Sequence, residues 1–540
     1  MRTIGNVLAA LLLAGSASAQ RRGLDVQEYI FEITIPDTGV SVSARAFVSF
    51  EPHADTVLTL DLVGMTVDSV NAFAMGHGSG SGAPIPYEHD GLVIRIPLRA
   101  LHGSKRLLVS YHGVPKDGLI ISVNGRGRRA VFADNWPQRA RYWLPVVDHP
   151  RDKARVSFLV TAPPTWRVVA NGRLMPRDVV PVDTASSHAS MWRQGSPIPT
   201  YTMVIGAGEF TVSKHRPALG DGGTIPIEVW TYPEDSAYAD SVPFRRATEI
   251  VEVMQRLVGP YPYANLKHVQ SSTRFGGMEN SSAIFYAEKP YVERRMGEGV
   301  VRHETAHQWF GDAVTPRDWP HLWLSEGFAT YFDGVIGAAL DGDTVLANHM
   351  RDNAESYFKS DVTDRPIVDS ANAAEPMKLL NANSYPKGAW VLHMLRGLTG
   401  DRAFFNGLRT YYRTYRDSTA TSEDFQHVME KASGKDLSWF FHQWLYQPGY
   451  PQLDVTWQQD AGAGRMLVGI TQRQKPEWGV FRIPALTLEF RDANGTTLRR
   501  DVAVTGAETS ARIDLPFAPS EVRVDPGGKL LLRVTAISRR

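Results

Sequence analysis

Hydrophobic and polar residues alternate in short runs over residues 24–214. Leu58, Leu60 and Leu62, for example, are separated by polar residues. Because successive side chains of a strand point to opposite faces of a sheet, this period of two is typical of half-buried strands. Gly, Pro, Asn and Asp separate the runs, and no long helical pattern interrupts them. The pattern predicts an all-β domain.

From about residue 225 the period becomes helical. A hydrophobic residue at every third or fourth position places one apolar stripe along a helix. The residues that recur in this way are Phe244, Ala247, Val251, Met254 and Val258, and a Gly-Pro pair at 259–260 ends the run. We expect helical segments to continue from there to Trp444.

After Pro451 the strand pattern returns. Residues 485–490 and 496–504 are two strand-like runs, and the Asp-Ala-Asn-Gly stretch at 492–495 between them is typical of a hairpin turn. The roughly ninety residues that follow Pro451 are enough for a small β-sandwich. The whole pattern therefore predicts an α+β multidomain protein, with strands at both ends and helices between them.

Length, charge and cysteine content limit the classes of protein. A chain of 540 residues should hold about two to four domains. The net charge of +1 gives no reason to expect a nucleic-acid partner. The chain has no cysteine, which excludes disulfides, thiolate metal sites and cysteine nucleophiles.

The first nineteen residues have the pattern of a secretory signal peptide. Arg2 precedes an apolar run over residues 4–14, and Ala17-Ser18-Ala19 is a small-residue cleavage site before Gln20. A membrane anchor is the alternative, but the run is too short to span a bilayer comfortably, and no later run is apolar enough. We expect export to the periplasm or the medium, without a membrane anchor.

The strongest chemical signal is the stretch His303-Glu304-Thr305-Ala306-His307. Residues i and i+4 of a helix are neighbours on one face, so both imidazoles can bind one Zn²⁺ while Glu304 lies beside the metal. A zinc hydrolase needs three protein ligands and an open position for water. The alternative is that both histidines are ordinary helix residues.

Glu326 is the candidate third ligand. It follows His307 after eighteen residues, in a stretch where Leu324, Phe328 and Tyr331 have helical spacing. A proline-marked loop at 315–320 allows this second helix to fold back on the first. The sequence thus predicts one Zn²⁺ per chain, against the alternative that Glu326 is a solvated charge.

Three motifs together resemble a known family. The zinc stretch with its Trp-Leu-Ser-Glu-Gly-Phe-Ala partner at 323–329 looks like that of the zinc aminopeptidases related to aminopeptidase N and leukotriene hydrolase. Residues 276–280, Gly-Gly-Met-Glu-Asn, are similar to the family's exopeptidase signature, and Tyr-Pro-Lys-Gly-Ala at 385–389 is like its catalytic tyrosine motif. Weaker likeness extends over residues 24–451.

The resemblance implies a domain plan. After the signal peptide at 1–19 it gives an N-terminal all-β domain at 20–214, a thermolysin-like, mainly α-helical catalytic domain at 215–451 and a C-terminal β-sandwich at 452–540. Many relatives carry a large helical domain at the C-terminus, and the chain resembles a short, secreted, bacterial-type member without it.

The resemblance also implies residue roles. Glu304 is the expected general base, and Tyr385 the expected hydrogen-bond donor to the oxyanion. The bare backbone of the two glycines would pair with a peptide, and Glu279 would bind its free α-amine, which needs a charged partner when it is buried. Alternatively Tyr385 is a packed tyrosine and Glu279 a surface residue after a turn. The predicted substrate-binding residues are Gly276, Gly277, Met278, Glu279 and Asn280.

One position departs from the family pattern. Relatives often offer the substrate's N-terminus a glutamine several residues before the arginine that matches Arg141. Counting back from Pro145 places Asp134 there, and Gln138 is out of register. Asp134 is a tentative second acidic contact, and a solvated loop residue is the alternative.

The sequence therefore predicts a zinc aminopeptidase that acts on peptides with a free N-terminus. The alternatives are a different zinc reaction on the same scaffold, such as epoxide hydrolysis, a catalytically silent binding protein, and a zinc endoprotease. The complete set of zinc ligands, base and tyrosine argues against a silent protein, and residues 276–280 argue against an endoprotease.

Overall fold

The computed structural model describes residues 24–52, 56–73, 82–179, 187–220, 222–459 and 465–540. The predicted signal peptide lies outside the described residues. Contacts within the chain form two compact units: residues up to 319 together with 411–421, and residues 320–410 together with 422–540. The predicted domain boundaries after residues 214 and 451 stay a prediction.

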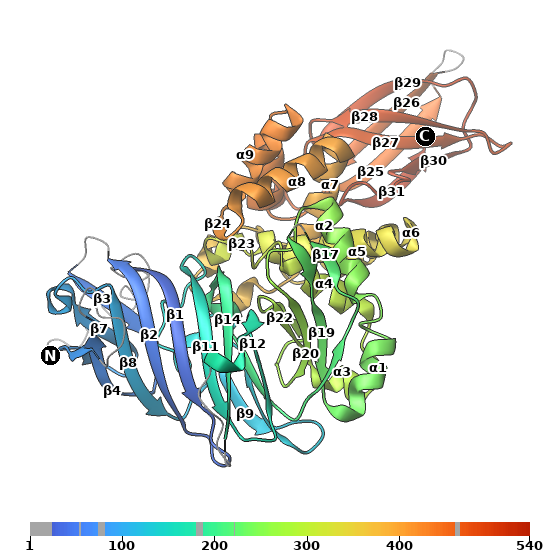
Figure 1. Cartoon of the computed structure of the whole chain (residues 1–540). Helices are drawn as coiled ribbons and strands as arrows, with labels where there is room; N and C mark the ends of the chain where they lie inside the picture. The colour runs from blue at the N-terminus through green and yellow to red at the C-terminus, as the bar shows by residue number, and fades with distance from the viewer. Residues whose placement is uncertain (1–23, 53–55, 74–81, 180–186, 221, 460–464) are drawn as a thin grey trace, which may run out of the picture. The chain divides into compact units, whose positions relative to one another are not determined.

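The N-terminal part of the first unit is built from strands, and its described residues contain no α-helix before residue 236, which confirms the predicted all-β character (Figure 1). The largest sheet has the order β13-β14-β11-β1-β2-β8-β4-β5. Its strands are β1 (Leu24–Thr34), β2 (Val42–Pro52), β4 (Thr66–Ala72), β5 (Ala83–Pro84), β8 (Arg106–Gly113), β11 (Lys153–Ala162), β13 (Arg173–Leu174) and β14 (His188–Pro199).

Two smaller sheets complete this part. One contains β3 (Val57–Asp61), β7 (Val93–Pro97) and β6 (Glu88–His89). The other has the order β12 (Arg167–Ala170), β15 (Ile205–Gly208), β10 (Arg129–Ala133) and β9 (Leu119–Val123). The alternation places one residue in two in the core: Tyr29, Phe31 and Ile33 of β1 are buried, and Phe31 stacks on Phe158 of the parallel neighbour β11 at 5.5 Å between ring centroids.

A five-stranded sheet follows where helices were expected. Its order is β16 (Thr211–Lys214), β19 (Ile227–Thr231), β20 (Leu266–Ser271), β22 (Ala283–Ala287) and β21 (Gly277–Met278). The prediction of helical segments was therefore wrong for residues 227–231 and 266–287. All six residues of β20 are buried, because its neighbours β19 and β22 run parallel to it inside the molecule. A strand buried on both faces lacks the alternation that identifies half-buried strands.

The helices of the first unit are α1 (Ser236–Ser241), α2 (Ala247–Leu257), α3 (Glu288–Val292) and α4 (Glu298–His307). The predicted apolar face of α2 is buried. Two short strand pairs, β17 (Ala218–Gly220) with β18 (Gly223–Ile225) and β23 (Val314–Pro316) with β24 (Ser418–Ala420), also belong to it. The predicted loop after the zinc stretch thus contains β23.

The second unit combines helices with two C-terminal sheets. Its helices are α5 (Trp323–Asp341), α6 (Thr344–Phe358), α7 (Gly388–Thr399), α9 (Ser422–Ser433), α10 (Ser438–Phe441) and most of α8 (Asp401–Tyr415). One sheet has the order β29 (Glu508–Asp514), β26 (Arg465–Gln472), β25 (Gln452–Gln459) and β31 (Arg533–Arg539). The other has the order β28 (Thr497–Val504), β27 (Ile483–Arg491) and β30 (Glu521–Val524). Both sheets contribute to one hydrophobic core, and the predicted hairpin is confirmed as β27–β28.

The fold class is therefore the predicted one: α+β, with a β-rich N-terminal part, a helical catalytic region and C-terminal β-sheets. None of the helices in the described ranges is both long enough and apolar enough to cross a membrane.

Candidate functional site

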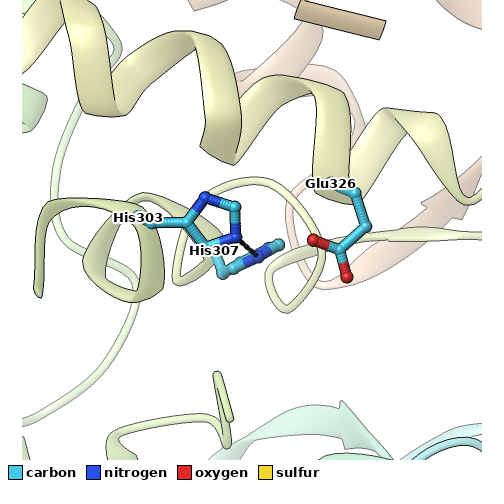
Figure 2. Close-up of side chains that lie close together, drawn as sticks. All are labelled: His303, His307 and Glu326. Atoms are coloured by element: carbon cyan, nitrogen blue, oxygen red, sulfur yellow. Dashed lines mark hydrogen bonds between the residues drawn. The ribbon is translucent and has the colours of Figure 1, made fainter. Parts of the chain in front are cut away.

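The three predicted metal ligands lie together. His303 and His307 come from the last turns of α4, and Glu326 from the first turn of α5. One nitrogen of each histidine and one carboxylate oxygen of Glu326 all lie within 4.8 Å of one another (Figure 2). The i, i+4 spacing places the two Nε2 atoms 3.1 Å apart.

This donor set fits zinc. Two ligands each about 2.0–2.1 Å from a tetrahedral ion are about 3.3 Å apart, close to the separation of the two Nε2 atoms. Nδ1 of His307 lies 3.2 Å from the carbonyl oxygen of Phe310. Because a carbonyl oxygen only accepts hydrogen bonds, this contact puts the proton of a neutral imidazole on Nδ1 and leaves Nε2 free to bind a metal.

Two glycines bring α5 and α7 into close contact beside Glu326. A Cβ added at Gly327 would lie 2.9 Å from the Cα of Gly388, so both positions require glycine. The turn Asn383–Lys387, which contains Tyr385, leads directly into α7. The contact therefore fixes the turn that carries the predicted oxyanion donor relative to the helix that carries the third ligand.

Lys387, two residues after Tyr385, is packed inside the second unit. Its side chain is fully buried, and its ammonium donates a hydrogen bond of 3.3 Å to the carbonyl oxygen of Gln447. Burial lowers the pKa of Lys387 to about 7. Tyr385 of the same motif is half-buried, and its role as the oxyanion donor stays a prediction.

The exopeptidase stretch forms an edge strand. Gly277 and Met278 make up β21, which pairs with β22 on one side only and ends the five-stranded sheet. The carbonyl oxygen of Gly276 accepts a 3.1 Å hydrogen bond from the Ala287 amide. Met278 and Asn280 are buried, at 3% and 0% exposure, whereas Gly276 is exposed and Gly277 half-buried. The backbone of the two glycines is therefore the accessible part of this segment.

Gly277 has a second role that the sequence did not reveal. A Cβ added at Gly277 would lie 2.6 Å from Cγ of Glu304 and closer still to its carboxylate. The glycine therefore leaves the space that the Glu304 side chain occupies, and it brings the predicted base directly against the predicted substrate strand.

Gly277→Ala is expected to displace Glu304 and to lower kcat at least a hundredfold, as expected for a lost general base, with zinc retained. The matched control is Gly276→Ala, because a Cβ at Gly276 meets no atom within 4 Å. We expect it to change KM more than kcat. Steady-state kinetics and zinc content of both variants test this, and equal losses of kcat would contradict the proposed packing.

Gln308, which directly follows α4, connects this helix to residues 276–280. Its side-chain amide donates hydrogen bonds to the carbonyl oxygen of Glu279, at 2.7 Å, and to Asp312, at 2.9 Å, while its oxygen accepts from the Ser282 amide at 2.8 Å. No motif in the sequence pointed to Gln308. A polar side chain next to His307 on a buried segment was the available signal.

Asp134 is held inside the first unit. It is fully buried, Arg139 donates to one carboxylate oxygen at 2.5 Å, and the Arg274 amide donates to the other at 3.3 Å. Burial raises the pKa of the Asp134 carboxyl, and the charge of Arg139 opposes that rise. The alternative of a solvated loop residue is therefore wrong, and the contact with a substrate amine stays a prediction.

Comparison with protein families agrees with this geometry. The model of the peptidase family M1 domain matches residues 244–444, and that of the peptidase M1 N-terminal domain matches residues 27–202. The chain belongs to peptidase family M1. The His-His-Glu cluster of His303, His307 and Glu326 fits this family of metallo-aminopeptidases.

Similar proteins match different shares of this chain. A probable aminopeptidase 2 of Sulfurisphaera tokodaii is 28% identical over 74% of this chain, which spans 51% of that relative. Aminopeptidase A of Legionella pneumophila, solved with aspartic acid, superposes with a TM-score of 0.77 at 18% identity over 96% of this chain and 60% of its own. An M1 zinc metallopeptidase mutant of Deinococcus radiodurans, solved with a Tyr-Ser-Ala substrate, has a TM-score of 0.66 at 23% identity. The match covers 78% of this chain and 94% of that one. The chain thus spans about half the length or less of the curated relatives it matches.

Proposed function

We propose that this M1 peptidase is a zinc-dependent aminopeptidase that removes the N-terminal residue from peptides. The observation that carries the proposal is the packing of Glu304 against Gly277. This packing supports the proposal because Glu304, the predicted base, lies beside an edge strand that a peptide can extend, and Glu279 follows two residues after Gly277.

His303, His307 and Glu326 would hold the zinc. When bound, zinc lowers the pKa of water and polarises the carbonyl of a peptide bond. Glu304 takes the proton from the attacking water and later passes it to the leaving amine. Tyr385 donates a hydrogen bond to the oxyanion that develops on the substrate carbonyl.

The edge strand and Glu279 make the reaction exopeptidic. An extended peptide can add to the free edge of β21 through main-chain hydrogen bonds. Glu279 is 5% exposed, and its carbonyl is held by Gln308, so its carboxylate has a fixed position from which to bind a protonated α-amine. The position of this carboxylate would limit cleavage to the first peptide bond.

Tyr385→Phe is expected to lower kcat roughly a hundred- to a thousandfold, the cost of one oxyanion donor. KM should change much less, because the hydrogen bond strengthens mainly in the transition state. The exposed Tyr446, the last residue of another π-helical turn, provides Tyr446→Phe as a control that keeps kcat. A Tyr385→Phe variant with raised KM and unchanged kcat would assign Tyr385 to substrate binding.

An assay with two substrates separates the proposal from its rivals. We expect turnover of an amino-acid anilide and none of a fatty-acid epoxide. Turnover of the epoxide alone would indicate a different zinc reaction, and zinc binding without turnover of any peptide would indicate a binding protein.

We further propose that the protein is exported, on the basis of the signal pattern at residues 1–19. Cell fractionation with N-terminal sequencing should find the mature chain outside the cytoplasm, beginning at Gln20. A cytoplasmic chain that retains Met1 would contradict this.

A further inference from the structure

Four charged residues form a closed ring beside the exopeptidase strand. Arg139 contacts Asp134 at 2.5 Å and Asp117 at 3.4 Å, and Arg274 donates to Asp117 at 2.7 Å. The Arg274 main-chain amide closes the ring by donating to Asp134. Three members come from the β-rich part, and Arg274 lies two residues before Gly276. The ring therefore ties the segment that leads into β21 to the β-rich part.

The next residue on this segment is also held. The Phe275 ring packs edge-on against Trp136, with centroids 6.0 Å apart, and the Arg139 guanidinium lies 5.8 Å from its centroid. Arg139 thus contacts both the acidic members of the ring and the aromatic side chain. Residues 274 and 275 are fixed through main chain, charge and ring contacts together.

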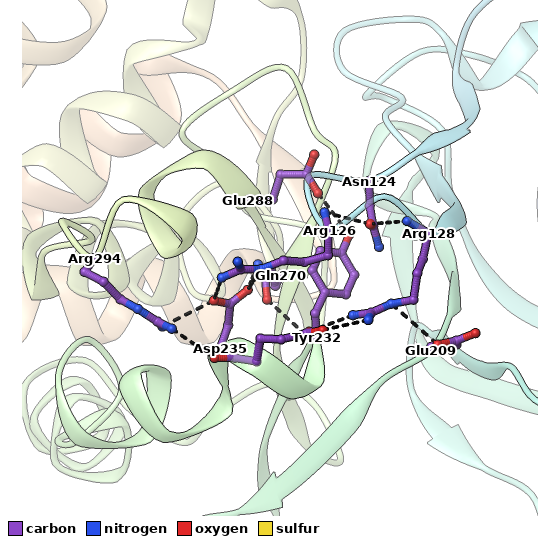
Figure 3. Close-up of polar contacts among 10 residues, drawn as sticks. Asn124, Arg126, Arg128, Glu209, Tyr232, Asp235, Gln270, Glu288 and Arg294 are labelled. Atoms are coloured by element: carbon purple, nitrogen blue, oxygen red, sulfur yellow. Dashed lines mark hydrogen bonds and ion pairs between the residues drawn. The ribbon is translucent and has the colours of Figure 1, made fainter.

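The hairpin β9–β10 that presents the ring is anchored at its other end (Figure 3). Asp117 precedes β9, Asp134 follows β10, and the turn between the strands carries Arg126 and Arg128. Arg126 pairs with the fully buried Asp235, and Arg128 forms a two-pronged pair with Glu234. These ion pairs and the ring thus lie at opposite ends of the hairpin, and only the ring contacts residues 274 and 275.

Glu279 has a main-chain contact outside this ring. Its carbonyl is fixed by Gln308, which follows the zinc helix. The ring therefore controls Gly276 and Gly277, whose backbone pairs with a peptide, whereas Gln308 controls the residue that binds the amine. Loss of the ring should therefore weaken pairing with the peptide backbone and leave binding of the α-amine unchanged.

We propose that Asp117, Asp134, Arg139 and Arg274 are positioning residues that hold the edge strand in register with the backbone of a peptide substrate. This inference rests on the proposed aminopeptidase function. It assigns Asp134 a role through Arg139 and Arg274, because both of its carboxylate oxygens accept hydrogen bonds within the ring. Strand pairing needs consecutive peptide groups, which a tripeptide has and an aminoacyl arylamide lacks.

The test compares these two substrates. Arg274 is 54% exposed, so Arg274→Gln should fold. We expect its kcat/KM for a tripeptide to fall roughly tenfold, mainly through KM, since a small misplacement of a substrate-positioning group is costly. The aminoacyl arylamide should be affected less than twofold. Asp134→Asn should show the same split, and Arg274→Lys should restore most of the tripeptide activity.

The matched control is Arg128→Gln, which removes an ion pair from the same hairpin at its far end and should leave both substrates unaffected. Equal losses on both substrates for Asp134→Asn would overturn the inference, because a residue that binds the amine serves both. Unchanged kinetics in Arg274→Gln and Asp134→Asn would also overturn it.

Hydrogen exchange gives a readout that does not need turnover. Amides of residues 276–278 should exchange faster in Arg274→Gln and Asp134→Asn than in the wild type and in Arg128→Gln. Unchanged exchange would overturn the positioning role. A wild type that hydrolyses neither substrate would overturn the proposed function, and the exchange rates would still decide whether the ring positions the strand.

Discussion

Glu304→Gln is expected to keep zinc and to lose nearly all turnover. The amide has almost the same shape as the carboxylate, so the packing against Gly277 is preserved, but it cannot accept the proton of the attacking water. General acid–base groups contribute factors of 10²–10⁴, and we expect a loss in kcat of roughly a thousandfold. Zinc analysis and steady-state kinetics on the same preparation measure both effects.

The matched control lies on the same helix. Glu298→Gln changes a carboxylate in the first turn of α4 that pairs with Arg246 and Arg302. It should retain kcat within about threefold, since general acid–base catalysis belongs only to a group in reach of the reacting proton. A Glu304→Gln variant with near wild-type kcat would show that another group is the base.

Glu326→Ala is expected to abolish zinc binding. The substitution leaves two histidine ligands where zinc hydrolases use three protein ligands. After dialysis we expect about one zinc per wild-type chain and a small fraction of one per variant chain, with activity lost in parallel. Metal analysis on the folded protein is the primary readout, because it does not depend on the assay.

An exposed carboxylate that is not one of the metal ligands controls for loss of charge. Glu375→Ala removes an exposed residue that pairs only with Lys378 among its described ion pairs, and it should keep full zinc content. Full zinc occupancy in Glu326→Ala would show that Glu326 is not the third ligand. In the wild type, a chelator should abolish activity and added zinc should restore it.

The zinc ligands could be predicted because local geometry determines them. Residues four apart on a helix share one face in every fold, so His303 and His307 are neighbours wherever this helix lies. A short loop between two helices is then enough to bring Glu326 near them. The same holds for α2 and for the β27–β28 hairpin, where the sequence period and the turn residues agree with the observed elements.

Long-range features were not predictable in the same way. Strand β20 has no alternation because both of its faces are buried, so its sequence resembled a helical segment. The contact between Gly277 and Glu304 joins residues that the sequence separates, and nothing in either motif indicates that they touch. The bonds of Gln308 and the ring around Asp134 likewise depend on tertiary packing.

The most direct test of the central claim compares one peptide with its N-acetylated form. A protonated α-amine loses hydration in the site, and the Glu279 carboxylate offsets that cost. We expect release of the first residue from the free peptide and almost none from the acetylated one. Glu279→Ala should lose kcat/KM for the free peptide by several kcal/mol in transition-state terms, with zinc content unchanged. Efficient cleavage of the acetylated peptide at internal bonds would contradict the account and identify an endoprotease.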